Sequence, residues 1–141
     1  MTDFKYRNEI LLVTLIAAVF AFLWFNQFDV RVGKVNVQLQ NDPELAAYPY
    51  TFRLIDIDQQ GIANVSTPRS AKVSVLQFFA IVKPELAEKG SNSPKLIAAQ
   101  KEISFLQEKA KQIVLAHPDI QQVHWQIDKH WYASKGVELY L

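Results

Sequence analysis

The sequence predicts an α+β protein, with an N-terminal transmembrane helix followed by a small antiparallel sheet covered by one long helix. Three observations lead to this prediction. Residues 10–25 carry no charge, residues 94–116 repeat apolar side chains at helical intervals, and segments of alternating polarity flank that repeat. The 141 residues suffice for one small domain plus an appendage. We therefore expect a cytoplasmic tail and anchor over residues 1–28 and an extramembrane domain over residues 29–141.

The composition narrows the classes of function. Hydrophobic residues make up 50% and charged residues 21% of the chain, a balance that suits a globular domain with an extra apolar segment. A formal net charge of +1 provides no strong field for nucleic acid, so no nucleic-acid partner is expected. The absence of cysteine excludes disulfides, thiolate nucleophiles and zinc–thiolate sites. The four glycines are too scattered for a phosphate-binding loop.

The segment Ile10–Phe25 predicts a membrane span. Thr14 is its only polar side chain. A span needs roughly 20 residues, and the apolar stretch extends to Phe28, so we place the span from Ile10 to Phe28. Aromatic residues at its C-terminal end, including Trp24, resemble an interfacial belt. The membrane is therefore the first expected partner.

Two alternatives compete with an uncleaved anchor. A signal peptide cut after Ala21 would leave Phe22–Phe25 exposed at a new terminus and would split the apolar run. A buried core helix would have a polar face, which this segment lacks. Both alternatives are disfavoured.

The orientation of the span follows from the flanking charges. Lys5 and Arg7 precede the span, and Arg31 and Lys34 follow it, so the side chains balance. The free amino terminus then favours a cytoplasmic N-terminus. We expect a single-pass protein of the bacterial inner membrane with its C-terminal domain in the periplasm.

The first half of the domain predicts three strands. Val30–Gln40 alternates apolar and polar residues with one phase shift, which indicates a strand with a bulge. Residues 41–49 read as a loop or short turn. Tyr50–Ile57 predicts a second strand, Asp58–Gly61 a hairpin connection, and Ile62–Val65 the returning strand.

Residues 70–83 fit both a helix and a strand. We favour a helix that begins near Pro68 and is kinked or ended by Pro84. Residues 88–94 then break the chain. The helical reading rests on the spacing of Val75, Phe78, Phe79 and Val82, and the strand reading on Val73, Val75, Phe79 and Ile81.

The clearest element is a long helix over Pro94–Ala116. Ser93 can cap it, and Pro118 marks its end. One side of this helix carries an apolar stripe that is wider than a coiled-coil seam. This width favours packing on the sheet over pairing with another chain. The stripe consists of Leu96, Ala99, Ile103, Leu106, Ala110 and Ile113, widened by Phe105, Val114 and Leu115.

The C-terminal segment predicts a strand, a turn at Ser134–Gly136 and a returning strand over residues 137–141. The two faces of the first strand differ in character. The apolar face holds Val123, Trp125 and Ile127, and the polar face holds His124, Gln126, Asp128 and His130.

Asp128 and His130 are candidate metal ligands because they lie two residues apart on one predicted strand face. On a regular strand His124 and His130 are about 20 Å apart, too far to share one ion. A third or fourth ligand is missing from the pattern. We favour a solvated strand face and expect no metal or cofactor here.

Asp56 and Asp58 are the second candidate pair. Two carboxylates at this spacing hold magnesium in nucleotidyl transferases, but such sites also need an upstream Gly-Ser turn, which is missing here. Aspartates before a hairpin also serve the turn itself. We favour the turn role, so no catalytic residue is expected.

The region from Ser66 to Gly136, which contains STPRS and AHPDIQQVHWQIDKHWYASKG, resembles short proteobacterial single-pass proteins of unknown function. Some of these carry the label glutamate-ammonia-ligase adenylyltransferase. The resemblance implies a bacterial envelope location and no particular site residues.

Together these observations favour a non-enzymatic structural or interaction subunit of an envelope assembly, with a protein partner. Two alternatives remain open. One is a membrane-tethered metal-dependent enzyme, similar to nucleotidyl transferases, that uses Asp56 and Asp58. The other is a small-ligand or metal sensor built on the Asp128 and His130 face.

Overall fold

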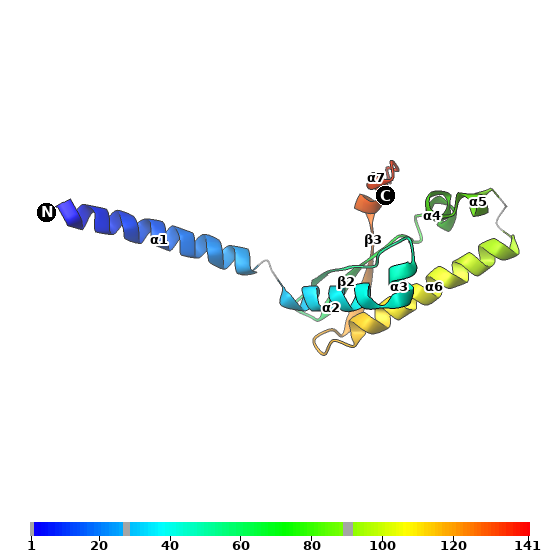
Figure 1. The fold of residues 1–141 in the computed structure, drawn as a ribbon, viewed down its shortest axis with the longest axis horizontal. Coiled ribbons are helices and arrows are strands. Elements are labelled where there is room, and N and C mark those ends of the chain that lie inside the picture. The colour runs from blue at the N-terminus through cyan, green and yellow to red at the C-terminus, as the bar shows by residue number, and fades with distance from the viewer. Residues whose placement is uncertain (1, 27–28, 89–91) are drawn as a thin grey trace. The chain divides into compact units, whose positions relative to one another are not determined.

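A computed structural model describes residues 2–26, 29–88 and 92–141. The chain divides into two compact units, Met1–Val30 and Arg31–Leu141. Mixed helix and sheet content confirms the α+β class. Figure 1 shows the helices and strands of both units in chain order.

The first unit contains helix α1, Thr2–Asn26. Every side chain described from Tyr6 to Asn26 is exposed. Thr14 donates its hydroxyl proton to the backbone oxygen of Ile10 at 2.8 Å, so this polar group is paired within the helix. At 1.5 Å per residue the helix is about 37 Å long, which exceeds the roughly 30 Å of a bilayer core. In the described part of the chain it alone is long and apolar enough to cross a membrane.

Nine further elements follow α1 in the described residues, and the colours of Figure 1 follow them in chain order. In order they are α2 (Val30–Asn41), α3 (Pro43–Ala47), β1 (Leu54–Ile57), β2 (Ile62–Thr67), α4 (Val75–Val82), α5 (Pro84–Ala87), α6 (Pro94–Leu115), β3 (Gln122–Ile127) and α7 (Lys129–Ser134).

The three strands form one sheet in the order β1-β2-β3. β1 and β2 are antiparallel and joined by the predicted tight connection, whereas β2 and β3 are parallel. The prediction of a purely antiparallel sheet is therefore wrong. The chain leaves β2 through α4, α5 and α6 before it enters β3, and such a long helical crossover is what joins parallel neighbours.

The segment predicted as the first strand is helix α2. Val35 and Leu39 are one helical turn apart and both are buried, with Val32 packed beside them. The other apolar residues that produced the alternation, Val30 and Val37, are exposed. Over so short a segment, the spacing of a strand and the spacing of a helix place apolar residues at several of the same positions. The helix forms because it buries apolar side chains in the core.

Residues 41–49 contain the short helix α3, where a loop or turn was expected. The Asp42 side chain accepts hydrogen bonds from the backbone N–H groups of Glu44 and Leu45, at 3.0 and 3.1 Å. Pro43 occupies the first helical position. This is the usual chemistry of a helix start.

The hairpin is confirmed, with adjusted bounds. β1 covers only the second half of Tyr50–Ile57, and β2 extends two residues beyond the predicted Ile62–Val65. The irregular register lies in β1, between Leu54 and Asp56, and not in residues 30–40.

Residues 70–83 contain helix α4, Val75–Val82, which confirms the prediction of a helix in this segment. The helix begins after Ser74, whose hydroxyl accepts from the Leu76 N–H, and not at Pro68. Pro84 ends it and starts α5. Residues 89–91 of the predicted break lie outside the described residues.

The long helix is confirmed as α6, capped by Ser93. It packs within the domain, and five of the six predicted stripe residues are buried. Ile113 is only partly buried, and Phe105 is 58% exposed, so the prediction that Phe105 widens the stripe is wrong. The buried residues of α6 are Leu96, Ala99, Ile103, Leu106, Ala110 and Val114.

The predicted final hairpin is wrong. Helix α7 follows β3 directly, and residues 137–141 form no strand. Asp128 accepts from the Trp131 N–H at 2.9 Å and starts the helix. Gly136, at φ +79°, ends it with bonds from its own N–H to the Ala133 oxygen and from the Val137 N–H to the Tyr132 oxygen. This is the pattern of a Schellman cap.

Two glycines with the same left-handed φ of +79° provide a matched test of the β1–β2 turn. A Cβ on Gly61 would lie 2.9 Å from the Asp119 carbonyl oxygen, whereas one on Gly136 would meet nothing within 4 Å. Gly136→Ala should lower the free energy of unfolding by about 1–2 kcal/mol, the cost of a left-handed conformation. Gly61→Ala should cost clearly more, because the clash with backbone adds to the same strain. Urea unfolding of both variants measures the difference, and equal losses would contradict the close approach at Gly61.

Candidate functional site

A chain of polar side chains crosses the exposed face of the sheet. Asp56 of β1 lies opposite Asn64 of β2, and Asn64 lies beside His124 of β3. The Asn64 Nδ2 donates to the Asp56 Oδ1 at 2.6 Å, and the Asn64 Oδ1 lies 2.8 Å from the His124 Nδ1. We call these three residues the polar ladder. Alternation along each strand places all three on the same face.

The ladder determines which histidine nitrogen carries a proton. An amide nitrogen only donates and an amide oxygen only accepts. Asn64 therefore donates a hydrogen bond to Asp56 and accepts one from the N–H at the His124 Nδ1. In neutral His124 the Nε2 is then an acceptor. The arrangement can hold a polar group at the sheet surface, and it also ties the three strands together. Its members are exposed or half-buried.

The structure separates the two carboxylates of the Asp56 and Asp58 pair. Asp56 belongs to the polar ladder. Asp58 lies beyond the end of β1, where its Oδ1 accepts from the Gln60 and Ile62 N–H groups at 2.8 and 2.9 Å. Asp58 thus shapes the hairpin turn, the role favoured from the sequence.

The Asp128 and His130 pair does not lie on one strand. Asp128 is half-buried, caps α7 and accepts a hydrogen bond from the Tyr50 hydroxyl at 3.1 Å. His130 lies on α7 and is exposed. The expectation of a shared strand face is therefore wrong, because β3 ends at Ile127. In the described part of the chain no three His, Asp or Glu side chains gather into a set able to hold a metal.

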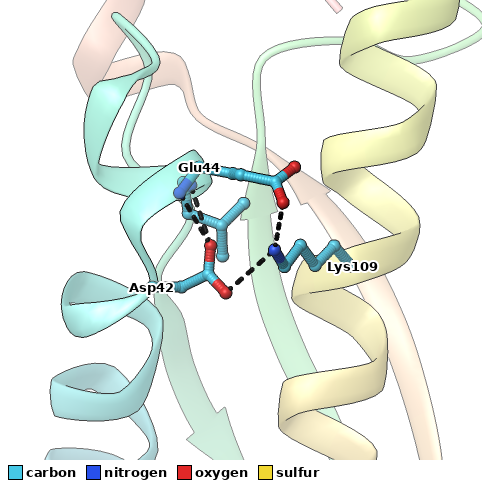
Figure 2. Close-up of polar contacts among 4 residues, drawn as sticks. Asp42, Glu44 and Lys109 are labelled. Carbon is cyan, nitrogen blue, oxygen red and sulfur yellow. Dashed lines mark hydrogen bonds and ion pairs between the residues drawn. The ribbon is translucent and has the colours of Figure 1, made fainter.

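An ion cluster that the sequence analysis missed joins α3 to α6 (Figure 2). The Lys109 Nζ lies 3.1 Å from the Asp42 Oδ2 and 2.9 Å from the Glu44 Oε1. Asp42 and Glu44 flank the first position of α3, while Lys109 is 65 residues or more away along the chain. The N-cap pattern at Asp42 was readable from the sequence, but its cationic partner was not.

This cluster predicts how stability varies with pH. The Leu45 backbone N–H is the main cause of the lowered Asp42 pKa, and the hydrogen bond to Glu44 is the main cause of the raised Lys109 pKa. The Asp42 contribution is present above its unfolded pKa and is lost as the pH falls. The Lys109 contribution is present below its unfolded pKa and is lost as the pH rises. Both contributions are therefore present between about pH 4 and about pH 10.

Lys109→Met should lower the urea midpoint by a constant amount between about pH 5 and about pH 9, with the loss shrinking outside these limits. Lys111→Met on the same helix is the control, since among the described residues the ion pair of Lys111 is with Glu108 of α6 itself, at 3.7 Å. A Lys109→Met loss that is unchanged at about pH 3 would contradict this origin.

In the described part of the chain, pockets lie at the margins of α6, and two of them are lined by residues of that helix. The larger, about 420 Å³, is lined by polar and apolar side chains: Arg69, Ser70, Ala71, Val73, Val75, Gln107 and Trp125. The smaller, about 270 Å³, lies where α3 faces α6, and Tyr48 lines it. Among the described residues the buried Tyr48 hydroxyl has no hydrogen-bond partner, and burial raises its pKa to about 12.

Comparison with known proteins yields no matching family model, no similar curated protein and no similar solved structure. The reading of this chain therefore depends on its own residues.

Proposed function

We propose that this chain is a single-pass, membrane-anchored interaction subunit of a bacterial envelope assembly, without an enzymatic role. Residues 29–141 form its periplasmic domain, and a second protein is its partner. One observation carries the proposal: helix α1 exposes a run of apolar side chains from Ile10 to Phe25, broken only by Thr14, and a folded domain follows it. So large an apolar surface needs a membrane or a partner to cover it.

One further observation supports a binding role over catalysis. Asp58 and Asp128, each a member of a candidate carboxylate pair, are engaged in a turn and a helix cap. The resemblance of residues 66–136 to proteobacterial single-pass proteins favours the envelope. The charges around the span and the amino terminus favour the periplasmic side for the domain.

Membrane anchoring is tested by alkaline carbonate washing of bacterial membranes that contain the full chain. We expect the protein to stay with the membrane and to need detergent for release. Leu15→Arg should weaken this retention, because an arginine near the middle of a span costs about 2.5–3.5 kcal/mol. Ile97→Arg, on the exposed surface of α6, is the matched control and should not weaken it. Release of the wild type with a new N-terminus near Phe22 would identify a signal peptide and overturn the anchor.

The orientation needs a separate test with reporters fused after Leu141. A reporter that is active only in the periplasm should be active, and one that is active only in the cytoplasm should be silent. The opposite pattern would place the domain in the cytoplasm and overturn that part of the proposal.

A further inference from the structure

The two edges of the sheet differ in how their backbone groups are satisfied. At the β1 edge, the side chain of Asn36 on α2 donates to the Leu54 carbonyl at 2.9 Å and accepts from the Leu54 N–H at 2.8 Å. The irregular register of β1 lies at the same place. A bulge and a covering helix are two of the ways in which proteins block a strand edge.

In the described residues, β3 has no bulge against β2, and no side chain bonds its outward backbone groups as Asn36 does at β1. The Asp128 N–H donates to the Thr67 oxygen at 2.9 Å, and the Gln122 N–H reaches the Gly61 oxygen at 3.4 Å, so even-numbered residues of β3 face β2. In a parallel ladder the alternate residues then face away. The outward N–H and C=O groups belong to Val123, Trp125 and Ile127, and within the described residues none of these groups has a partner.

The sequence of β3 adds no deterrent to pairing. Its register with β2 is regular over all six residues, and the strand contains neither lysine nor proline. Val123, Trp125 and Ile127 are each half-buried, so their apolar side chains are covered from one side only. Another strand along this edge would pair the backbone groups and cover the same side chains.

The larger pocket adjoins this edge, because Trp125 of β3 lines it. Arg69 lies in the same pocket, and its Nε donates to the Gln107 Oε1 at 3.0 Å. Within the described residues no carboxylate forms an ion pair with Arg69. The remaining lining is mostly small or apolar: Ser70, Ala71, Val73 and Val75. The pocket therefore combines an apolar wall with a cation that has no ion-pair partner among the described residues.

We propose that the β3 edge binds an extended segment of a partner protein as a fourth strand, and that an acidic side chain of this segment enters the pocket and pairs with Arg69. This deepens the proposed interaction function and rests on it. Backbone pairing supplies affinity, and the pocket supplies selectivity, as in other cases of strand addition. A guanidinium can bind a carboxylate through two hydrogen bonds.

The geometry of a strand specifies the pattern of the segment. Alternate side chains point to opposite faces of a sheet. On the pocket side, apolar residues should flank the acidic one and cover Trp125. On the other side, beside His124 and Gln126, the residues should be polar. The expected pattern is polar–apolar–polar–acidic–polar–apolar–polar.

The probes are dye-labelled heptapeptides added to the full chain in mild detergent, with binding followed by fluorescence anisotropy. One set is Thr-Xaa-Thr-Glu-Thr-Xaa-Thr, with Ala, Val, Leu or Phe at Xaa, and its twin set carries Lys in place of Glu. We expect Glu peptides to bind roughly tenfold or more tightly than their Lys twins, which corresponds to about 1.4 kcal/mol. Absence of binding by every Glu peptide, or equal binding by both sets, would overturn the proposal.

Charge reversal identifies the side chain responsible. Arg69→Glu should invert the preference towards the Lys peptides, and Lys101→Glu, an exposed reversal on α6, should leave it unchanged. Circular dichroism checks the fold. If Arg69→Glu does not fold, Arg69→Gln should abolish the preference and Arg69→Lys should retain part of it. A preference that survives loss of the Arg69 charge would overturn the assignment of this residue.

Backbone pairing is tested with N-methylated peptides. One series of peptides carries N-methyl groups on the odd-numbered amides and the other on the even-numbered amides, so each series lacks every second donor. The series whose methyl groups face β3 should lose binding, and the other should keep it. Equal effects of the two series would rule out strand addition.

The oligomeric state distinguishes a partner from a second copy of this chain. Light scattering of the full chain in detergent should show a monomer. A dimer that dissociates when residues 137–141 are deleted would assign the β3 edge to the tail of a second copy and overturn a separate partner. The membrane tests above are independent of these results, so anchoring can hold even where peptide binding fails.

Discussion

Phe78→Ala is expected to lower the free energy of unfolding by about 3–5 kcal/mol, the usual cost of removing a buried phenylalanine ring. The Phe78 side chain is fully buried on α4. Four aromatic rings surround it, and the cavity left by alanine would be difficult to close because rings are rigid. The neighbouring ring centroids lie at 5.5 Å for Phe79, 5.6 Å for Trp131 and 6.4 Å for both Tyr48 and Tyr50.

The measurement is urea unfolding of the full chain in mild detergent, followed by near-ultraviolet circular dichroism, which reports on packed aromatic rings. Phe105→Ala is the matched control, because Phe105 is 58% exposed on α6, and its loss should stay within about 0.5 kcal/mol. Similar losses for the two phenylalanines would mean that Phe78 does not form the centre of the aromatic core.

Leu106→Ala is expected to lower the free energy of unfolding by about 2–5 kcal/mol. Leu106 is 4% exposed and lies in the middle of the buried stripe of α6. That stripe packs in the same core as Ala63 and Val65 of β2, so alanine would leave a cavity in this core. Ile97→Ala, on the same helix but 43% exposed, should cost far less.

The histidine changes complete this comparison. His124→Ala and His130→Ala should each cost within about 0.5 kcal/mol, because both side chains are exposed. A loss for either histidine larger than that for Leu106 would reverse the assignment of buried and exposed faces. A Leu106→Ala loss that grows with protein concentration would indicate that the stripe pairs with another chain.

The elements that the sequence alone determined are those with strong local signals. These signals are the apolar run of α1, the Ser93 cap and six-residue stripe of α6, and the Asp58–Gly61 turn. Each of them predicts its structure from residues that are close together in the sequence. In β3 the alternation also identified the inner face correctly, since Val123, Trp125 and Ile127 are more buried than their neighbours. Such periodicities need no knowledge of distant residues.

Segments with two compatible patterns were decided by tertiary packing. Val30–Asn41 alternates like a strand, but as a helix it buries Val35 and Leu39 and brings Asn36 to the Leu54 backbone. The predicted strand continued past Ile127 to His130, yet the Asp128 cap and the Tyr50 hydroxyl start a helix there. In both cases the deciding partner lies 18 residues or more away along the chain.

The candidate binding features also depend on the tertiary structure. Asp56 and His124 were visible as polar residues on predicted strands, but their link through Asn64 requires the register of three strands. The open edge of β3 exists only because β3 pairs in parallel with β2 and no described strand follows it in the sheet. The sequence by itself determined an apolar helix, a hairpin and a stripe, because these signals are local. Strand order and open surfaces arise from contacts between distant residues, so only the tertiary structure decided them.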